Sequence, residues 1–314
     1  MINIYKSSLD GKLIEIQEYE VDCWINMVAP TESELLEVSR KYNVDKDFLL
    51  AALDDEEHSR IEIDNENSTT LILVDSPIME KEIERSVYNT IPIAIIHTKQ
   101  VVITVCLREN VVFQSFKTGT VKTFFTYKKS RFILQILYGN AMLFLKDLKQ
   151  IDKLSEEVES RLHVSMKNKE LIQLLDLQKS LVYFSTSLRA NGMVLRRLTR
   201  LSFMNLYAED KELLEDTVIE NEQAVEMSKI YTDILSGTMN AYSSVISNNL
   251  NIVMKLLTSI TIVMAIPTMI YSFYGMNVSS LPFVDRADGY LIIFIFSVIS
   301  CLISIIIMAK KKMF

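Results

Sequence analysis

The residues whose types and spacing could do chemistry lie near the end of the chain, in and just before an uncharged stretch at 256–274. If this region forms one helix with about 3.6 residues per turn, its mostly small or polar side chains fall within a stripe about 100° wide. The stripe comprises Asn251, Met254, Thr258, Thr261, Ala265, Thr268 and Ser272, with Leu257 just outside one edge. Bulky apolar residues such as Ile260 and Val263 lie opposite. Such a row of oxygen atoms can line a polar path, but small residues also favour helix–helix packing in membranes, and the stripe alone supports both interpretations equally.

The length of this stretch indicates the element that positions it. Residues 256–274 would form a helix of about 28 Å, close to the hydrocarbon thickness of a bilayer. A second uncharged run of the same length, 290–308, follows after a short connection. We therefore predict two transmembrane helices joined by a hairpin loop. The alternative is an apolar core hairpin of a soluble protein, which is less favoured because buried soluble helices seldom stay uncharged for so long.

Charges around the two runs predict their orientation. Lys255 precedes the first run, and three lysines at 310–312 follow the second, whereas the loop contains one basic residue, Arg286. The positive-inside rule then places both termini in the cytoplasm and the loop outside. The first residues contain no apolar run, so we expect no signal peptide.

A four-residue motif closes the first run and supports a family assignment. It consists of Tyr274, Gly275, Met276 and Asn277. Together with the segment Asn-Asn-Leu-Asn-Ile-Val-Met-Lys that enters the first run and the lysines after the second, it resembles the CorA family of magnesium transporters. The resemblance covers the layout of the whole chain and is strongest from about residue 248. It implies channel-like transport of Mg²⁺ across the cytoplasmic membrane by a multi-pass homo-pentamer, gated by cytoplasmic Mg²⁺.

The resemblance also implies roles for the residues of the first run. Asn277 would form a ring at the external mouth, and the stripe residues with Leu257 would line the pore. Neither run contains Asp or Glu, so neutral oxygen atoms must serve the ion, which suits the tightly hydrated Mg²⁺. Ala265 is smaller than the residue that the family pattern can carry there, so we expect the tightest apolar constriction at Leu257 and Met254. Gly275 is predicted to be the left-handed residue that ends the helix.

Carboxylates between neighbouring cytoplasmic domains sense Mg²⁺ in the family. Asp216 resembles one such position, and Asp54 or Asp55 is the candidate for its partner, with a solvated acidic surface as the alternative. Mg²⁺ would then be both the transported ion and a regulatory ligand. The external loop lacks acidic residues directly after the motif, because Asp285 and Asp288 come later.

The rest of the chain predicts an α/β cytoplasmic domain followed by a helical stalk that continues into the membrane. Residues 1–107 show strand-like runs at 2–5, 12–17, 23–27, 68–75, 88–97 and 100–106, and helix-like runs at 31–41 and 45–52. Thr31 and Glu34 have the spacing of a capping box. From 108 the pattern is helical, and one helix is expected from about 211 into the membrane because no proline occurs before Pro267. The predicted domains are 1–107, 108–254 and 255–314.

Composition excludes several classes of function. Residues 1–250 contain 28 basic and 38 acidic residues, a balance that argues against nucleic acid as a partner and suits divalent cations. We find no phosphate-binding loop and no enzyme signature, and the three cysteines and three histidines lack metal-ligand spacing. Two alternatives remain: the same fold transporting Co²⁺, Ni²⁺ or Zn²⁺, which the lack of Cys and His in the first run disfavours, or a membrane-anchored cation sensor that does not transport.

Overall fold

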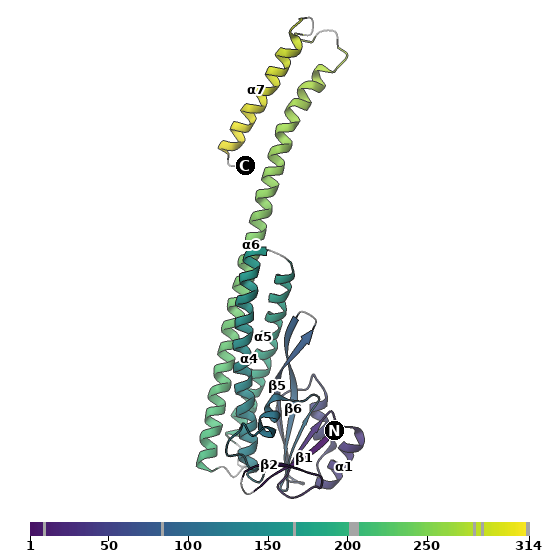
Figure 1. Cartoon of the computed structure of the whole chain (residues 1–314), viewed down its shortest axis with the longest axis vertical. Helices are drawn as coiled ribbons and strands as arrows, with labels where there is room; N and C mark the ends of the chain where they lie inside the picture. The colour runs from purple at the N-terminus through teal and green to yellow at the C-terminus, as the bar shows by residue number, and fades with distance from the viewer. Residues whose placement is uncertain are drawn as a thin grey trace. The chain divides into compact units, whose positions relative to one another are not determined.

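The chain divides into two compact units, Met1–Ser236 and Gly237–Phe314. The structure, a computed structural model, describes residues 1–8, 11–82, 85–165, 168–200, 207–278, 281–283 and 286–311 (Figure 1). Asp285 and Lys312, which were considered above, lie outside the described residues. The domain boundaries predicted after residues 107 and 254 stay predictions.

A mixed sheet forms the centre of the first unit. Its strands, in the described part of the chain, are β1 (Ile2–Ser7), β2 (Leu13–Ile16), β3 (Trp24–Val28), β4 (Arg60–Asp64), β5 (Thr69–Glu82), β6 (Arg85–His97) and β7 (Val102–Cys106). They lie in the order β2-β1-β3-β7-β6-β5-β4. The pairing of β3 with β7 is parallel, and the other pairings are antiparallel.

Both faces of the sheet are covered, because its apolar residues alternate between two cores. On β6, Ile93 and Ile95 join one core, whereas Ala94 and Ile96 join the other. The first core includes residues of α3 (Val111–Lys117), α4 (Lys129–Ser165) and α5 (Asn168–Leu198), and the second includes α1 (Glu32–Tyr42) and α2 (Lys46–Leu50) with the short turn Ala51–Leu53. The predicted α/β fold is therefore confirmed, and α4 and α5 lie side by side on one face of the sheet (Figure 1).

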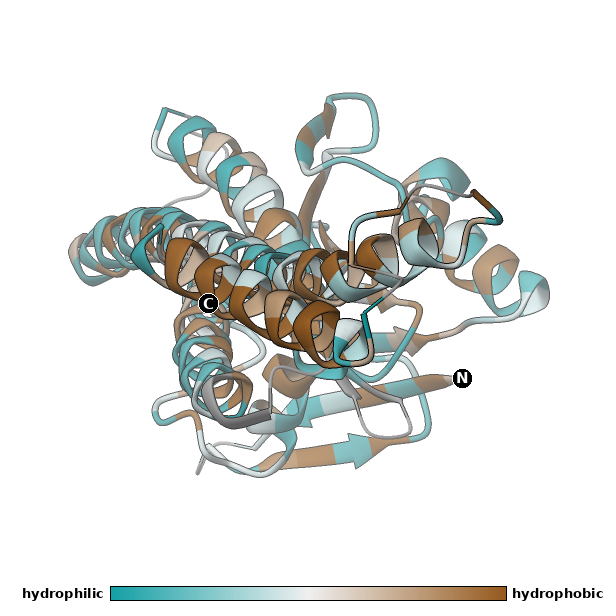
Figure 2. Ribbon diagram, turned by 90° about the horizontal axis from the view of Figure 1, so that it is seen from above, coloured by the Kyte–Doolittle hydropathy of each residue, from teal (hydrophilic) through white to brown (hydrophobic). Residues whose placement is uncertain are grey.

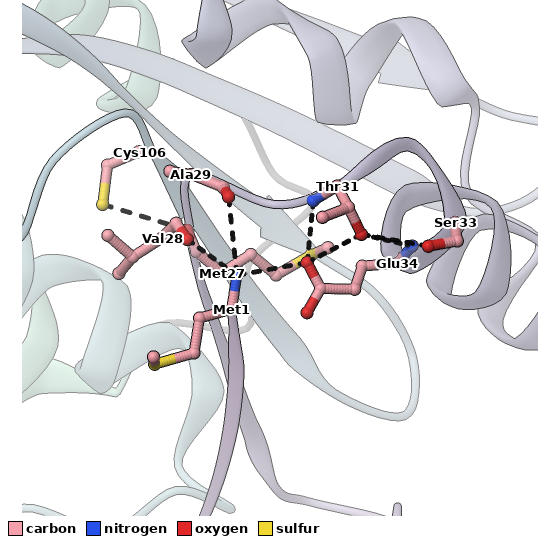
Figure 3. Close-up of polar contacts among 8 residues, drawn as sticks. All are labelled: Met1, Met27, Val28, Ala29, Thr31, Ser33, Glu34 and Cys106. Atoms are coloured by element: carbon pink, nitrogen blue, oxygen red, sulfur yellow. Dashed lines mark hydrogen bonds and ion pairs between the residues drawn. The ribbon is translucent and has the colours of Figure 1, made fainter.

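The predicted capping box begins α1 (Figure 3). The Thr31 hydroxyl accepts from the Glu34 amide at 3.4 Å, and the Glu34 carboxylate accepts from the Thr31 amide at 2.7 Å. The amino group of Met1 also donates to Glu34, at 3.1 Å. These interactions, the Thr31 amide first among them, lower the pKa of Glu34. Two main-chain donors that a helix start would otherwise leave unsatisfied thus have partners.

Two strands differ from the sequence prediction. β4 was not predicted, since it offers only two apolar residues, Ile61 and Ile63, among charged ones directly after an acidic run. β5 continues to Glu82 instead of ending at residue 75, because it pairs with β6 as a long hairpin beyond the end of β4. The presence of β4 and the length of β5 both depend on pairing with a neighbouring strand, and a local sequence pattern does not contain that information.

The predicted long helix is present as α6 (Ala208–Tyr274), 67 residues with Pro267 inside it. A second apolar helix, α7 (Gly289–Lys310), follows. Both are long and apolar enough to cross a membrane, by length and composition. Among the described residues of α7, the buried ones are Gly289, Ser297 and Met308. In Figure 2 the helix that ends at the C-terminus is coloured as hydrophobic along most of its length. The second unit therefore presents an apolar surface that the chain itself does not cover.

Candidate functional site

The predicted stripe on α6 lies on a face that α7 leaves open. Asn251, Met254, Leu257, Thr258, Thr261, Ala265, Thr268 and Ser272 are all exposed in the single chain. On the other face, Ser259 is fully buried, and Val263, one turn later, contacts α7. α7 turns the row Ser297, Cys301 and Met308 toward α6, since these residues are buried or half-buried. The small and polar face of α6 is thus free to meet something other than α7.

Pro267 leaves one main-chain carbonyl of α6 without its helical donor, and a side chain of α7 replaces that donor. A proline has no N–H, so the Val263 carbonyl four residues earlier loses its helical donor. The Cys301 thiol of α7 donates to this carbonyl at 3.8 Å. The acceptor that Pro267 leaves open therefore faces α7 and not the stripe. The loss of the donor follows from the sequence, whereas its replacement by Cys301 does not, because the register between two helices cannot be read from either helix alone.

Two hydroxyls of the stripe are oriented by their own helix. The Thr261 hydroxyl donates to the Leu257 carbonyl at 2.8 Å, and the Thr268 hydroxyl donates to the Met264 carbonyl at 3.0 Å. A hydroxyl has one proton and two acceptor lone pairs. Once the proton is used within the helix, each oxygen can only accept hydrogen bonds from outside it. The stripe is therefore suited to water molecules whose protons point toward it, as those around a cation do.

The end of α6 differs in one respect from the prediction. Positive φ occurs at only two of the described glycines, Gly11 and Gly119, so the prediction that Gly275 is left-handed is wrong. Instead the Gly275 amide donates to the Tyr271 carbonyl at 2.9 Å and continues the helical bonding. A Cβ at Gly275 would lie 3.3 Å from that same carbonyl oxygen. Glycine here therefore lets the chain leave the helix without a side chain against that carbonyl, and Asn277, two residues later, is exposed.

The predicted regulatory carboxylates are not gathered into one site. Asp54, Asp55 and Asp216 are exposed. Asp54 has a local role, because its carboxylate accepts from the Glu56 amide at 3.0 Å and stabilises the turn before β4. Within the described residues, no three His, Cys, Asp or Glu side chains are grouped as metal ligands. One chain therefore does not build a metal site at these positions.

Comparison with known proteins finds relatives over the whole chain. Residues 20–311 match the family described as CorA-like Mg²⁺ transporter protein. The chain is 26% identical to the cobalt/magnesium transport protein CorA of Methanocaldococcus jannaschii, over 99% of both chains. It is 24% identical to the magnesium transport protein CorA of Helicobacter pylori, over 98% of this chain and 95% of that one. The complete structure of the Methanocaldococcus jannaschii CorA magnesium transporter matches with a TM-score of 0.82 and 25% identity, over 98% of this chain and 96% of that one.

Proposed function

Because this chain belongs to the CorA-like family of Mg²⁺ transporter proteins, which move divalent cations across membranes, we propose that it conducts Mg²⁺ as a channel-like transporter of the cytoplasmic membrane. The observation that carries the proposal is the face of α6 that α7 leaves open, with its row of small and polar side chains. Two helices cannot enclose a path for an ion. Several copies must therefore contribute their first span, and the resemblance to the family makes five the expected number.

In this assembly the ion stays hydrated at the mouth. The amide oxygens of Asn277 accept hydrogen bonds from the water around Mg²⁺, an ion that loses its water reluctantly. Main-chain carbonyls near Gly275 add acceptors, and about half a negative charge per helix end attracts the cation. Because these groups are neutral, they hold the ion weakly enough to let it leave. Further inward, the hydroxyl oxygens of Thr268 and Thr261 receive it, and Leu257 and Met254 form the constriction.

Gating belongs to the cytoplasmic side. Both termini lie in the cytoplasm in this proposal. Exposed carboxylates such as Asp216, Asp54 and Asp55 bind Mg²⁺ between neighbouring subunits, and the bound Mg²⁺ holds the pore closed. When cytoplasmic Mg²⁺ falls, the acidic surfaces repel one another and the stalk helix shifts. Co²⁺ is the second candidate for the transported ion, since the name of the Methanocaldococcus jannaschii relative includes cobalt.

The central test replaces Asn277 in the purified full-length protein in liposomes. Asn277→Ala should abolish Mg²⁺ uptake while leaving assembly intact, because the ring of water acceptors is lost. Asn277→Asp should bind cations more tightly and conduct poorly. Val278→Ala, at an exposed neighbouring position, is the matched control and should conduct like the parent. Flux is compared for Mg²⁺, Co²⁺ and Zn²⁺.

Near-normal Mg²⁺ uptake by Asn277→Ala would contradict the role of Asn277 at the mouth of the pore. The assembly is checked separately by light scattering in mild detergent. A mass of one chain per particle would contradict the pore and favour a membrane-anchored sensor.

A further inference from the structure

Helix α5 carries a buried amide, Asn191, that completes the hydrogen bonding of a strand. Its Nδ2 donates to the Asp75 carbonyl of β5 at 2.8 Å, and its Oδ1 accepts from the Asp75 amide at 2.9 Å. β4 pairs with β5 only as far as Leu73, so the main chain of Asp75 lies beyond the end of β4. Asn191, whose exposed fraction is 3%, bonds this main-chain unit in place of a strand, and the Asn140 side chain of α4 donates to the same carbonyl at 2.7 Å.

The same amide holds the end of the acidic loop. Ser59 lies two residues after the acidic run 54–57, which contains Asp54 and Asp55, and its hydroxyl donates to Asn191 Oδ1 at 3.0 Å. Asn191 thus fixes two different segments, the loop before β4 and the middle of β5, on one turn of α5. A displacement of the loop changes the geometry of a buried hydrogen bond, where a lost partner is costly.

The other side of that turn is bonded to α6. The Asn221 side chain donates to the Leu188 carbonyl of α5 at 3.1 Å. Gly192 makes room for this contact, because a Cβ at Gly192 would lie 3.1 Å from Asn221 Nδ2. A second link follows farther along, where the Ser228 hydroxyl donates to the Leu181 carbonyl at 3.1 Å. Asn221 and Ser228 are both buried, so these links belong to the packed interior of the first unit.

We propose that Ser59, Asn191, Gly192 and Asn221, here called the α5 junction, are positioning residues that couple the acidic loop to the stalk helix within one subunit. This inference rests on the gating proposed above. Each end of the junction is close in sequence to a candidate regulatory carboxylate, since Ser59 follows Asp54 and Asp55 and Asn221 lies just over one turn after Asp216. A packed, hydrogen-bonded junction of this kind passes a displacement from one element to the next because it deforms in steps and not continuously.

The test uses the full-length protein in liposomes and measures flux as internal Mg²⁺ is varied. Ser59→Ala removes the link to the loop, and Asn221→Ala removes the link to α5 while the Leu188 carbonyl keeps its place in the helix. Each should raise the Mg²⁺ concentration for half-closure by about five-fold or more, the lower range of typical coupling between sites. Flux without internal Mg²⁺ should stay like that of the parent. Thr186→Ala is the control, because this exposed hydroxyl donates to the Val182 carbonyl of its own helix.

A purely structural role predicts a different result, namely a lower melting temperature with half-closure at the parent's Mg²⁺ concentration. That outcome in both single variants overturns the junction. If the two residues act in series, the double variant should shift half-closure no more than the larger single change, whereas fully additive shifts contradict a shared path. A parent that does not close with Mg²⁺ overturns the gating proposal as well, while a parent that closes beside unshifted variants overturns the junction alone.

Discussion

The two units of the chain differ in how their apolar side chains are kept from water. In the first unit, Trp24 is fully buried, and its indole donates to the Thr104 hydroxyl at 2.8 Å, which in turn donates to Asn26. In the second unit, most described residues of α7 are exposed although nearly all are apolar. The first unit therefore draws its stability from its own core. The second presents apolar side chains to its surroundings, as a membrane-spanning unit does, and in the proposed pore further copies of the chain would cover part of them.

The largest effect should follow from emptying the core of the first unit. Trp24→Ala removes a ring whose centroid lies 5.1 Å from that of Tyr5 and 5.2 Å from that of Phe132. It also leaves the Thr104 hydroxyl without the indole N–H that donates to it. We expect a loss of about 3–5 kcal/mol in the free energy of unfolding. Trp24 is the only tryptophan, so the variant has no tryptophan fluorescence with which to follow unfolding. Circular dichroism of the full-length protein in detergent is therefore the suitable measurement.

Phe294→Ala in α7 is the matched comparison. Its side chain is 58% exposed, so detergent replaces lipid around it and unfolding should change little. Equal losses for Trp24→Ala and Phe294→Ala would erase the distinction between the two units.

A smaller effect, of opposite sign, is expected at Asp147 on α4. Burial raises its pKa to about 6, against the lowering effect of Lys146. Between the ordinary pKa of 3.8 and about 6, the folded state binds a proton that the unfolded state has lost. Its stability therefore falls as pH rises through this window, and the ionised carboxylate weakens the fold at pH 7.5. Asp147→Asn should recover about 2–3 kcal/mol there and almost nothing below pH 4.

Melting curves from pH 4 to 8 check this expectation. Glu157→Gln, on an exposed part of the same helix, is the control and should leave the pH dependence unchanged. A parent protein with no loss of stability between pH 4 and 6.5 would show that the Asp147 carboxyl is better solvated than its burial indicates.

The smallest effect is expected between α6 and α7. Cys301→Ala removes the donor to the Val263 carbonyl and should cost about 0.6 kcal/mol, the average for such contacts in membrane proteins. Cys301→Ser keeps a donor and should retain most of the stability. Ser300→Ala is the control, since the Ser300 hydroxyl donates to the Phe296 carbonyl within α7. The three variants are compared by thermal unfolding in lipid nanodiscs. Identical curves for Cys301→Ala and Cys301→Ser would contradict a stabilising hydrogen bond from the Cys301 side chain.

Much of the architecture could be predicted from the sequence, because its signals are local. The capping box of Thr31 and Glu34 needs three residues of spacing, and the course of α6 follows from the lack of proline before Pro267. Helical periodicity places the small and polar residues of α6 on one face, but it does not decide whether that face is open or packed. The features that were missed depend on distant partners. Asn191 bonds Asp75, 116 residues away, and nothing near either residue indicates the pair.

The one parallel pairing in the described sheet constrains the order of synthesis and folding. β3 needs β7 beside it, with Trp24 opposite Val102, so the first strands must wait for a distant segment to be made. At about 5–20 residues per second this takes roughly 4–16 s, during which unpaired strand edges are exposed to aggregation. The core around Trp24 also includes Leu214 of α6. Completion of the soluble unit thus falls close in time to the emergence of the apolar helices, and delivery of the nascent chain to the membrane competes with folding of the part that stays outside it.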